Sequence, residues 1–412
     1  MTESQARVAI DSIAAGGDGV GRLDGMAVFV PRTAPGDVAR VRLTRAKRFA
    51  RGEVEALDIA SPDRVEPPCP HYTRDRCGGC QVQHLSYDAQ LRVKGAIIGD
   101  ALRRLGRRTV ENPVVEPSDA PWRYRRKLTL HLRRVGSGWM AGLHPYDDPA
   151  AVFDLEDCPI TDERVMSVWA ELRPAFDLLP RERALRASVR LLDDGASVVV
   201  EGGRTWRAPE QFLQASPMVR ELWWRPDGSR ARLIAQRGAG DAARGASFAQ
   251  VNAGVAARLR AHVLERARAY DPARVVDGYA GLGATTLPLA KEGREVVAIE
   301  LDADAVASLQ GRLHAPSTAI AGRVEDHLAA SLPADVVLLN PPRTGIDARA
   351  AAALERVGRA PRAVLYTSCD PATLARDLSR LPRYRLASVR AYDMFPQTAH
   401  VETVCELVPE AA

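Results

Sequence analysis

The sequence lacks both a basic leader and any long apolar run. Its N-terminal segment has no basic stretch followed by an apolar one, and no apolar run approaches the length of a membrane-spanning helix. We therefore expect a cytoplasmic protein without membrane segments. Cysteine is scarce as well, since six in 412 residues are too few for a disulfide scaffold. Three of the six cluster together, which indicates metal chemistry in a reducing compartment.

Length and charge set the next limits. The chain has 412 residues, of which 46% are hydrophobic, so it can bury more than one core and we expect two or three domains. The formal net charge of +5 and the isoelectric point near 9.0 come mostly from arginine, whose planar fork of donors suits phosphate. This composition alone leaves two explanations open, a nucleic-acid partner and a GC-rich genome.

Residues 1–60 have the pattern of a small β-barrel. Short runs alternate apolar and polar positions, as in 26–30 and 38–43, and glycines separate them, which predicts a barrel of the OB type. Its second half is basic, and alternation would place several cations on one face as a track for phosphates. An ordinary solvated strand face is the alternative. The basic residues are Arg40, Arg42, Arg45, Lys47, Arg48 and Arg51.

Residues 61–245 form the second predicted domain. Prolines at 62, 67 and 68 mark a linker, and the periodicity predicts a helix over 87–105. We expect a mostly β domain here because the strand-like stretches have no recurring helices between them. These stretches are 127–133, 197–201 and 231–236.

Residues 246–412 change to an alternation of helices and strands. This pattern is typical of the α/β class with a doubly wound parallel sheet, in which ligands bind at the carboxyl ends of the strands. The loops after the strands are therefore where we expect site residues. The predicted elements are a helix over 255–269 and strands over 274–277, 295–300, 334–340 and 363–367.

A glycine-rich loop follows the first of these strands. Gly278, Gly281 and Gly283 are spaced G-x-x-G-x-G, and Glu300 ends the next strand, where it can reach ribose hydroxyls. The spacing differs from the G-x-G-x-x-G of dinucleotide-binding proteins, and the acidic Asp277 precedes it. A nucleoside ligand without a pyrophosphate fits better, which favours S-adenosylmethionine over NAD.

The loop after strand 334–340 argues against one class of methylation. It begins with Asn340, two prolines and Arg343. An aromatic residue in place of Arg343 would be typical of enzymes that methylate exocyclic amines. Amine methylation is therefore disfavoured.

A candidate nucleophile follows the last of these strands. Cys369 precedes Pro371, which suits the first turn of a helix, and a thiol at a helix N-terminus is favoured as thiolate. Glu402 is the candidate base, and His400 is a second one. Cys405 lies in an apolar strand and is expected to be core.

The cysteine cluster predicts a second site. Two glycines between the second and third cysteines permit a tight turn, and a remote cysteine can supply a fourth thiolate. Four thiolates can hold zinc or an iron–sulfur cluster, and the proline after the fourth cysteine favours the cluster. His71 could replace one cysteine in a zinc site. The four ligands are Cys69, Cys77, Cys80 and Cys158.

Together, these motifs resemble the uracil-5-methyltransferase family of 23S rRNA enzymes, over nearly the whole chain. The resemblance rests on the order of five features. These are an OB domain of the TRAM type, C-G-G-C-x-x-Q-H at 77–84, the loop at 277–283, T-S-C-D-P at 367–371 and F-P-x-T-x-H-V-E at 395–402.

The resemblance implies a Rossmann-like class I methyltransferase domain and a covalent mechanism. Cys369 would attack carbon 6 of a uracil, and Glu402 would remove the carbon-5 proton after methyl transfer. The four cysteines would hold a structural [4Fe-4S] cluster, and the helix over 87–105 would pack against the catalytic domain. Contacts to S-adenosylmethionine would come from Gln250, Tyr279, Glu300 and Asn340, beside the loop glycines Gly278 and Gly281.

Two departures from the family pattern concern these sites. Many members have aspartate where Asn340 stands, and the spacing between the first two cluster cysteines is often two residues shorter than here. The first departure affects how strongly the loop polarises its partner. The second allows an altered cluster stability.

The partner is expected to be RNA, with 23S rRNA favoured over tRNA and the target uridine flipped out of its helix. We expect a monomer. One alternative is a radical methylthiolation protein, but the C-x3-C-x2-C motif that it needs is absent. Another is a non-catalytic RNA-binding iron–sulfur protein.

Overall fold

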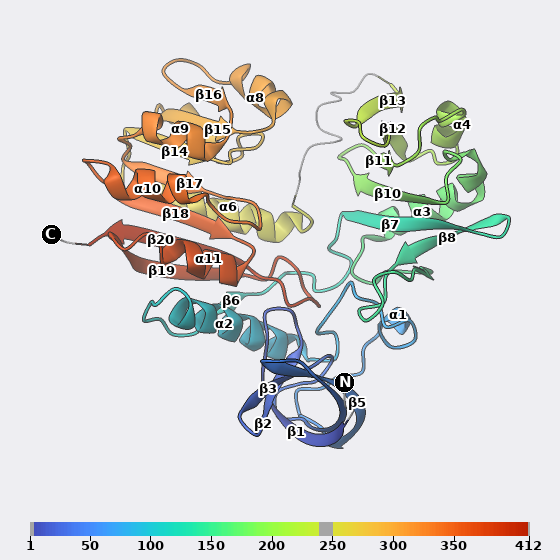
Figure 1. Cartoon of the computed structure of the whole chain (residues 1–412). Coiled ribbons are helices and arrows are strands. Elements are labelled where there is room, and N and C mark those ends of the chain that lie inside the picture. Colours follow the sequence, from blue (N-terminus) through green and yellow to red (C-terminus); the bar gives the residue numbers. More distant parts are fainter. Residues whose placement is uncertain (1–3, 239–249, 411–412) are drawn as a thin grey trace.

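The computed structural model describes residues 4–238 and 250–410. Its strands form a closed barrel, a central sheet and a C-terminal sheet. Figure 1 shows the barrel at the bottom, the central sheet at the right and the C-terminal sheet at the left. Among these residues, no helix is both long and apolar enough to cross a membrane.

The N-terminal barrel has the expected OB character. Its interior is filled by alternate apolar residues such as Val8, Val28, Val41 and Leu43, each 0% exposed, because every second side chain of a strand points inward. The barrel closes in the order β1-β2-β3-β5-β4. Its strands are β1 (Ser4–Ile13), β2 (Gly19–Leu23), β3 (Met26–Val30), β4 (Val38–Arg45) and β5 (Phe49–Ile59).

The basic residues of the barrel divide into two groups. Arg45, Lys47 and Arg48 are exposed where β4 passes into β5. The others lie against acidic side chains of the barrel, so their charge is locally offset. These pairs are Arg40–Asp58, Arg42–Glu53 and Arg51–Asp18.

The central region is mostly β, as predicted. Its sheet is covered by a helix that we did not predict from the sequence. Helix α3 (Glu163–Leu172) begins after the N-cap Asp162 and buries Val165, Trp169 and Leu172 against the sheet. The 3-10 helix η1 (Arg173–Leu178) and α4 (Pro209–Gln214) join the same core. The strand order is β13 (Arg232–Gln236), β12 (Val219–Arg225), β11 (Ala196–Glu201), β10 (Ala184–Leu191), β7 (Lys127–Val135), β8 (Gly138–Leu143) and β9 (Phe153–Asp154).

The C-terminal sheet is the expected α/β fold. β16 (Thr318–Ala321), β15 (Glu295–Glu300), β14 (Arg274–Gly278), β17 (Val336–Leu339) and β18 (Ala363–Ser368) are parallel neighbours in that order. β20 (Glu402–Pro409) and β19 (Tyr384–Tyr392) then continue the sheet as an antiparallel pair, which alternation of helix and strand did not predict.

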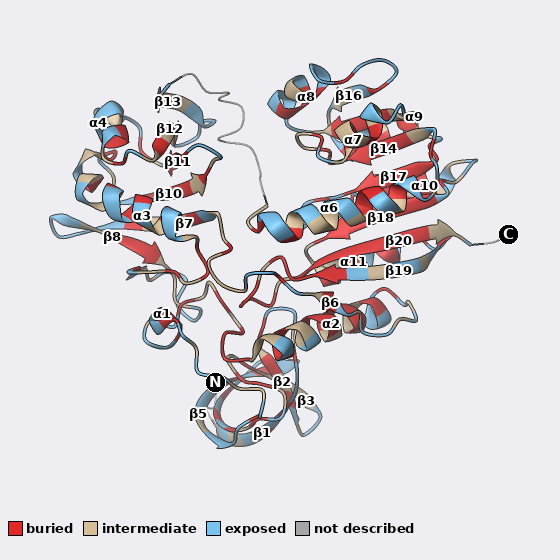
Figure 2. Ribbon diagram, turned by 180° about the vertical axis from the view of Figure 1, so that it is seen from behind, coloured by how far each residue is buried: buried red, intermediate tan, exposed pale blue. Residues whose placement is uncertain are grey.

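Helices cover this sheet, which is buried in its middle (Figure 2). Periodic apolar positions place their buried faces against the strands. The helices are α6 (Ala253–Arg268), α7 (Thr286–Lys291), α8 (Ala303–Gln310), α9 (Val324–Ser331), α10 (Ala348–Arg356) and α11 (Pro371–Leu378).

A segment from before the central sheet completes the C-terminal lobe. Helix α2 (Tyr87–Arg104) packs against α11, and Ile98 and Leu102 enter the same core as Leu378. The short strand β6 (Val115–Glu116) adds to the sheet edge beside β19. Residues 87–116 therefore contribute to the C-terminal lobe, which we call the third lobe below. In the chain they follow α1 (Pro70–Thr73) and precede the central sheet.

Candidate active site and cysteine cavity

The predicted site residues of the third lobe meet at one edge of its sheet. Gly278 lies level with Ile299 and with Leu339, and Leu339 lies level with Tyr366. The loops that carry Tyr279, Glu300, Asn340 and Cys369 therefore emerge side by side at the carboxyl edge of the parallel strands. Because β20 runs the opposite way, its first residue, Glu402, lies at this edge too.

The glycine-rich loop has a backbone that requires glycine. Gly281 and Gly283 have φ values of 54° and 79°, and a Cβ at Gly283 would come within 2.4 Å of the side chain of Leu309. The buried Asp277 accepts hydrogen bonds of 2.6 Å from the hydroxyls of Thr285 and Thr286. Asp277 therefore holds the loop in shape.

Glu300 connects the loop to the next strand. One carboxylate oxygen accepts a 2.8 Å hydrogen bond from the N–H of Gly281, and the other accepts one of 2.9 Å from the N–H of Asp302. A carboxylate can accept about four hydrogen bonds, so lone pairs remain for two hydroxyl groups of a ligand.

The other predicted cofactor residues have different surroundings. Tyr279 has a φ of 64°, which is uncommon for a side chain of this size, and its N–H donates to the carbonyl of Ile299 at 2.9 Å. Asn340 is exposed at the end of β17, and its N–H lies 3.4 Å from the carbonyl oxygen of Gly278. Gln250 opens the second described segment, just before the α6 N-cap residue Asn252.

Cys369 is half-buried between β18 and α11. The guanidinium of Arg343 lies near its sulfur. Burial raises the pKa of Cys369 and the nearby carboxylate of Glu402 adds to the rise, while Arg343 opposes it. The thiolate expected from the helix N-terminus is therefore disfavoured in the ligand-free protein, and Arg343 is the group positioned to stabilise it.

Glu402 faces the same place from the neighbouring strand. Ser368 pairs with Thr403, so the register continued by one residue brings Cys369 level with Glu402. Glu402 is 4% exposed, and burial raises its pKa to about 7, which the charge of Arg343 partly offsets. A carboxyl group with this pKa is matched to proton transfer near neutral pH.

His400, the second candidate base, also lies in this charged neighbourhood. Burial lowers its pKa, and the positive charges of Arg343 and Lys94 lower it further. The imidazole is therefore neutral near pH 7.

The segment before Glu402 is fixed from α2. Lys94 and Asp393 form an ion pair with side chains 1% and 0% exposed, and Lys94 also donates to the carbonyl of Phe395 at 3.0 Å. Gln90 exchanges two hydrogen bonds with Gln397, of 2.9 and 3.0 Å. A helix some three hundred residues earlier in the chain thus positions the strand that begins with the candidate base.

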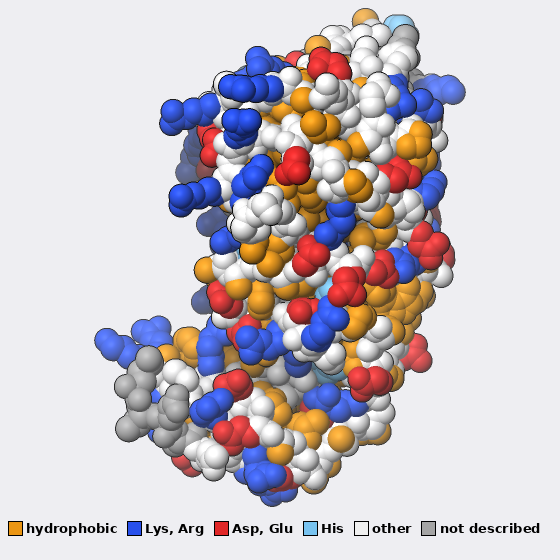
Figure 3. All heavy atoms as spheres, turned by 90° about the vertical axis from the view of Figure 1, so that its right-hand side faces the viewer, with side chains coloured by type: hydrophobic (Ala, Val, Ile, Leu, Met, Phe, Trp, Pro, Cys, Tyr) orange, Lys and Arg blue, Asp and Glu red, His pale blue; other side chains and the backbone are white. Residues whose placement is uncertain are grey.

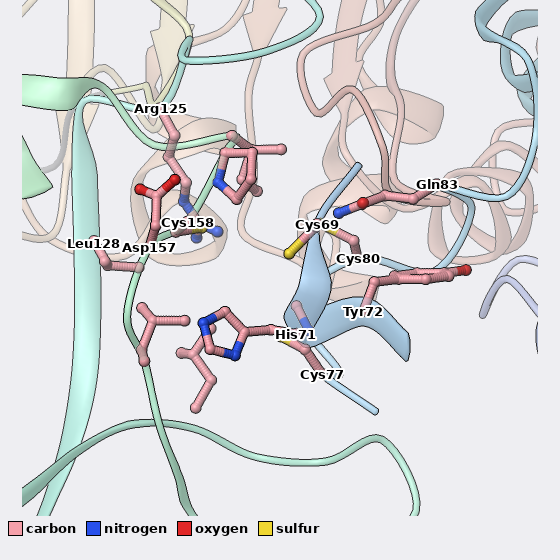
Figure 4. Close-up of a pocket in the computed structure, with 15 residues that line it drawn as sticks. Cys69, His71, Tyr72, Cys77, Cys80, Gln83, Arg125, Leu128, Asp157 and Cys158 are labelled. Carbon is pink, nitrogen blue, oxygen red and sulfur yellow. Dashed lines mark hydrogen bonds between the residues drawn. The ribbon is translucent and has the colours of Figure 1, made fainter. Parts of the chain in front are cut away.

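The four predicted cysteine ligands line one cavity in the second lobe (Figure 4). Each is a free thiol and is 6–8% exposed. In the described part of the chain, no group of three or more His, Cys, Asp or Glu side chains is arranged to hold a metal ion.

Two polar side chains of this cavity suit an anionic occupant. Gln83 lines the cavity, and its side chain opposes the rise in pKa that burial gives the thiols of Cys69 and Cys80. The Nε of Arg125 is buried at the cavity and lacks a hydrogen-bond partner there. A cluster held by four thiolates carries negative charge, so these residues fit it.

The alternative ligand His71 is engaged elsewhere. Its Nδ1 lies 2.6 Å from the carboxylate of Asp75, and its Nε2 accepts a 3.1 Å hydrogen bond from the N–H of Glu156. Both ring nitrogens are thus used, so His71 has no free lone pair for a metal.

Two residues of the candidate active site, Arg343 and Lys94, were not predicted from the sequence as functional residues. The sequence analysis interpreted Arg343 only as the residue that stands where an aromatic one would be. In the structure, its positive charge opposes the rise in the pKa of Cys369. Its position three residues after Asn340, at the carboxyl edge, was the available signal. Lys94 gave no signal, because its partner Asp393 is near only in space.

Two family models match parts of the chain, and full-length relatives are known. The family model described as tRNA (Uracil-5-)-methyltransferase matches residues 321–408, and the TRAM domain model matches residues 3–54. An uncharacterized RNA methyltransferase of Thermosynechococcus vestitus is 33% identical over 97% of this chain and 96% of its own length. Another, from Halalkalibacterium halodurans, is 31% identical over 97% and 96%.

A solved structure shares the whole architecture. The tRNA (uracil-54, C5)-methyltransferase of Pyrococcus abyssi, in complex with S-adenosyl-L-homocysteine, superposes with a TM-score of 0.73 at 24% identity. The match covers 98% of this chain and 100% of that one, which shows a common fold. The chain belongs to the family of TRAM-containing RNA methyltransferases, with a C-terminal domain of the uracil-5-methyltransferase type.

Proposed function

We propose that this protein transfers a methyl group to carbon 5 of a uridine in RNA, with Cys369 as covalent nucleophile and Glu402 as base. The observation that carries this proposal is the register of β18 and β20, which brings the thiol level with the buried carboxyl group beside Arg343. S-adenosylmethionine, when bound, supplies the methyl group as a sulfonium donor.

The residues of the chain account for the remaining steps. The sulfur of Cys369 bonds to carbon 6, and the electrons of the carbon 5–carbon 6 double bond move toward the carbon-4 carbonyl. Arg343 stabilises the attacking thiolate. After carbon 5 has accepted the methyl group, Glu402 removes its proton, the double bond re-forms and the thiolate leaves.

We propose that the methyl donor binds over the glycine-rich loop. Glu300 would accept from the ribose hydroxyls, because its carboxylate retains free lone pairs beside Gly281. Gly278 lets a ligand approach the backbone closely, and Tyr279, Asn340 and Gln250 would complete the site. Replacing Glu300 by alanine should weaken S-adenosylhomocysteine binding, measured by calorimetry, whereas Cys369→Ala should leave it unchanged.

We also propose a [4Fe-4S] cluster in the cysteine cavity. The support is the four buried thiols on one cavity, the buried Nε of Arg125 without a hydrogen-bond partner, and the engagement of both ring nitrogens of His71. Iron and acid-labile sulfide measured in anaerobically purified protein test this proposal, together with visible absorbance. Stoichiometric zinc without iron would contradict it.

For the substrate we propose 23S rRNA, in line with the motif order. tRNA is the second candidate, because the matching family model and the Pyrococcus abyssi enzyme are both named for tRNA. Mapping 5-methyluridine by mass spectrometry in both RNAs, from cells with and without the protein, decides between them. If no 5-methyluridine is lost from either RNA, the proposed function is wrong.

A further inference from the structure

One carboxylate of the third lobe is buried next to the candidate active site. Figure 3 shows Asp and Glu side chains at the surface of the side turned to the viewer, among Lys and Arg. Asp377 of α11 differs from these, because it is 0% exposed. A buried charge needs hydrogen bonds and cations in place of water, so the partners of Asp377 indicate what it holds in place.

Asp377 joins the elements on both sides of Cys369. One of its carboxylate oxygens accepts a 2.7 Å hydrogen bond from the hydroxyl of Tyr366, which lies in β18 shortly before Cys369. Asp377 itself lies in α11, which begins at Pro371, just after Cys369. The strand that leads to the candidate nucleophile and the helix that follows it are therefore linked by this side chain.

The same carboxylate holds the turn that carries Arg343. The N–H of Gly345 donates to the carbonyl of Pro342 at 2.8 Å, so Arg343 is the second residue of a β-turn. Directly after this turn, the N–H of Ile346 donates to Asp377 at 2.9 Å. Gly345 has a φ of 77°, and a Cβ there would lie 2.1 Å from the carboxylate of Asp377. The turn therefore packs directly on α11.

Arg376 holds the turn at a second point. Its guanidinium donates to the carbonyl of Thr344 at 2.6 Å and to the other carboxylate oxygen of Asp377 at 2.8 Å. Arg343 itself is exposed, so burial does not fix its side chain, which has the rotational freedom of every arginine. The position of its cation therefore depends on where this turn is held.

We propose that Asp377 is a positioning residue of this site, which holds the turn so that the cation of Arg343 faces Cys369. This role rests on the proposed function, in which Cys369 is the nucleophile and Arg343 stabilises its thiolate. The charged groups that face the thiol are Arg343, Glu402 and Asp370, and among them only Arg343 lowers its pKa. A turn that moves away therefore leaves the thiol more firmly protonated.

Alkylation of Cys369 by iodoacetamide tests this role, because the thiolate is the reacting form. The rate is followed from about pH 6 to 10 by mass spectrometry of the peptide that carries Cys369. Arg343→Met should slow the reaction about tenfold at neutral pH, since loss of a nearby opposite charge raises a thiol pKa by about one unit or more. Asp377→Asn should slow it about three- to tenfold, and the rates should converge above the pKa of the thiol.

Two further variants separate positioning from a loss of stability. Arg376→Met removes the bond to Thr344 at a side chain that is 44% exposed, so it should fold and should also slow alkylation. Asp335→Asn is the matched control. This carboxylate is 8% exposed, accepts from two backbone N–H groups and pairs with two arginines, but it precedes β17 and so lies at the opposite end of that strand. Its variant should lower stability and leave the alkylation of Cys369 unchanged.

A double-mutant cycle shows whether Asp377 acts through Arg343. In the Arg343→Met protein, adding Asp377→Asn should cause no further slowing, because the cation that Asp377 positions is gone. If Asp377→Asn does not fold, Arg376→Met in the same cycle decides. Wild-type profiles in Asp377→Asn and Arg376→Met, an unchanged profile in Arg343→Met, effects that multiply in the double variant, or an equal shift in Asp335→Asn would overturn the proposal.

The alkylation assay requires neither RNA nor S-adenosylmethionine. If the wild-type protein transfers no labelled methyl group to RNA but the variants change alkylation as expected, the proposed function fails and the positioning role stands. If the wild type methylates RNA and Asp377→Asn is alkylated as the wild type is, only the positioning role fails.

Discussion

The molecule holds five of its cysteines in two different surroundings. Cys369 is half-buried at the edge of a sheet, with a guanidinium and a carboxyl group as neighbours. The four cavity cysteines are buried on loops, where Gln83 lines the same cavity. Access and neighbouring groups, rather than the residue type, therefore distinguish the proposed nucleophile from the proposed ligands.

Burial acts on both groups in the same direction. It raises the pKa of Cys77 to about 12, and it raises the pKa of Cys369 as well. A cation must therefore compensate before either thiolate forms. Arg343 provides it at Cys369, whereas in the cavity the compensating charge would come from metal, whose binding releases protons.

One segment joins the two regions. The N–H of Val82, two residues after Cys80, donates to the carbonyl of Gln397 at 3.1 Å, and the hydroxyl of Tyr124 donates to the carbonyl of Pro396 at 3.0 Å. The cysteine cavity thus borders the segment that leads to Glu402. Damage to the cavity is expected to reach the base before it reaches the nucleophile.

The largest effect is expected where the sulfur itself is removed. Cys369→Ala should lower methyl transfer by roughly 10⁴-fold or more, because no other group can form the bond to carbon 6. Cys405→Ala is the matched control: this thiol is 0% exposed in β20 and should affect stability, not chemistry. Transfer of labelled methyl groups to RNA measures both. Substantial activity in Cys369→Ala would remove the covalent mechanism.

Removing the base should separate formation of the adduct from its release. In Glu402→Gln the thiol can still attack, but the carbon-5 proton stays, so turnover should fall by about 10²- to 10⁴-fold. The protein–RNA adduct should accumulate and survive denaturing electrophoresis. A freely dissociating and fully active variant would exclude Glu402 from this role.

These two residues show what sequence can establish. Strand ends, glycine spacing and the position of Cys369 are local signals, so the third lobe and most of its candidate site could be predicted. Lys94 and Asp393 could not be paired, because their contact joins positions 299 residues apart. Helix α3 was missed although Asp162 and the spacing of Val165, Trp169 and Leu172 mark it.

The antiparallel pairing of β19 with β20 was the other feature that the sequence could not predict. A parallel and an antiparallel strand have the same apolar pattern when both faces are buried, so periodicity could not give the direction of β20. That direction places Glu402 at the carboxyl edge. The family resemblance implies the role that we propose for this residue, and the register places it level with Cys369.

The contact between α2 and the catalytic segment can be broken directly. Lys94→Met leaves Asp393 buried without its cation, which should lower the free energy of unfolding by about 3–5 kcal/mol. Arg92→Met on the same helix removes an exposed ion pair with Asp63 and should cost less than about 1 kcal/mol. Urea denaturation compares the two. Equal costs would show that the buried pair does not fix α2 to this lobe.

The smallest effect concerns the ionisation of Glu402. Its folded pKa of about 7 exceeds the ordinary value of 4.5, so the folded state binds the proton more tightly than the unfolded state does. Stability from this group is fully present below pH 4.5 and is lost as the pH rises through 7. The 2.5-unit difference corresponds to a loss on the order of 3 kcal/mol, which Glu402→Gln should not suffer. Between pH 4 and 8, the free energy of unfolding of this variant should therefore rise relative to that of the wild type.

Glu406, on the same strand, is expected to make the opposite contribution to the pH dependence of stability. Burial would raise its pKa, but hydrogen bonds from Arg266, Tyr270 and Ser388 lower it overall. Its contribution to stability is therefore present at neutral pH and is lost as the pH falls through its folded pKa. Glu406→Gln should accordingly lose stability relative to the wild type at pH 8 and lose less in acid. If the two variants followed the same pH dependence, the proton at Glu402 would not be bound as the structure implies.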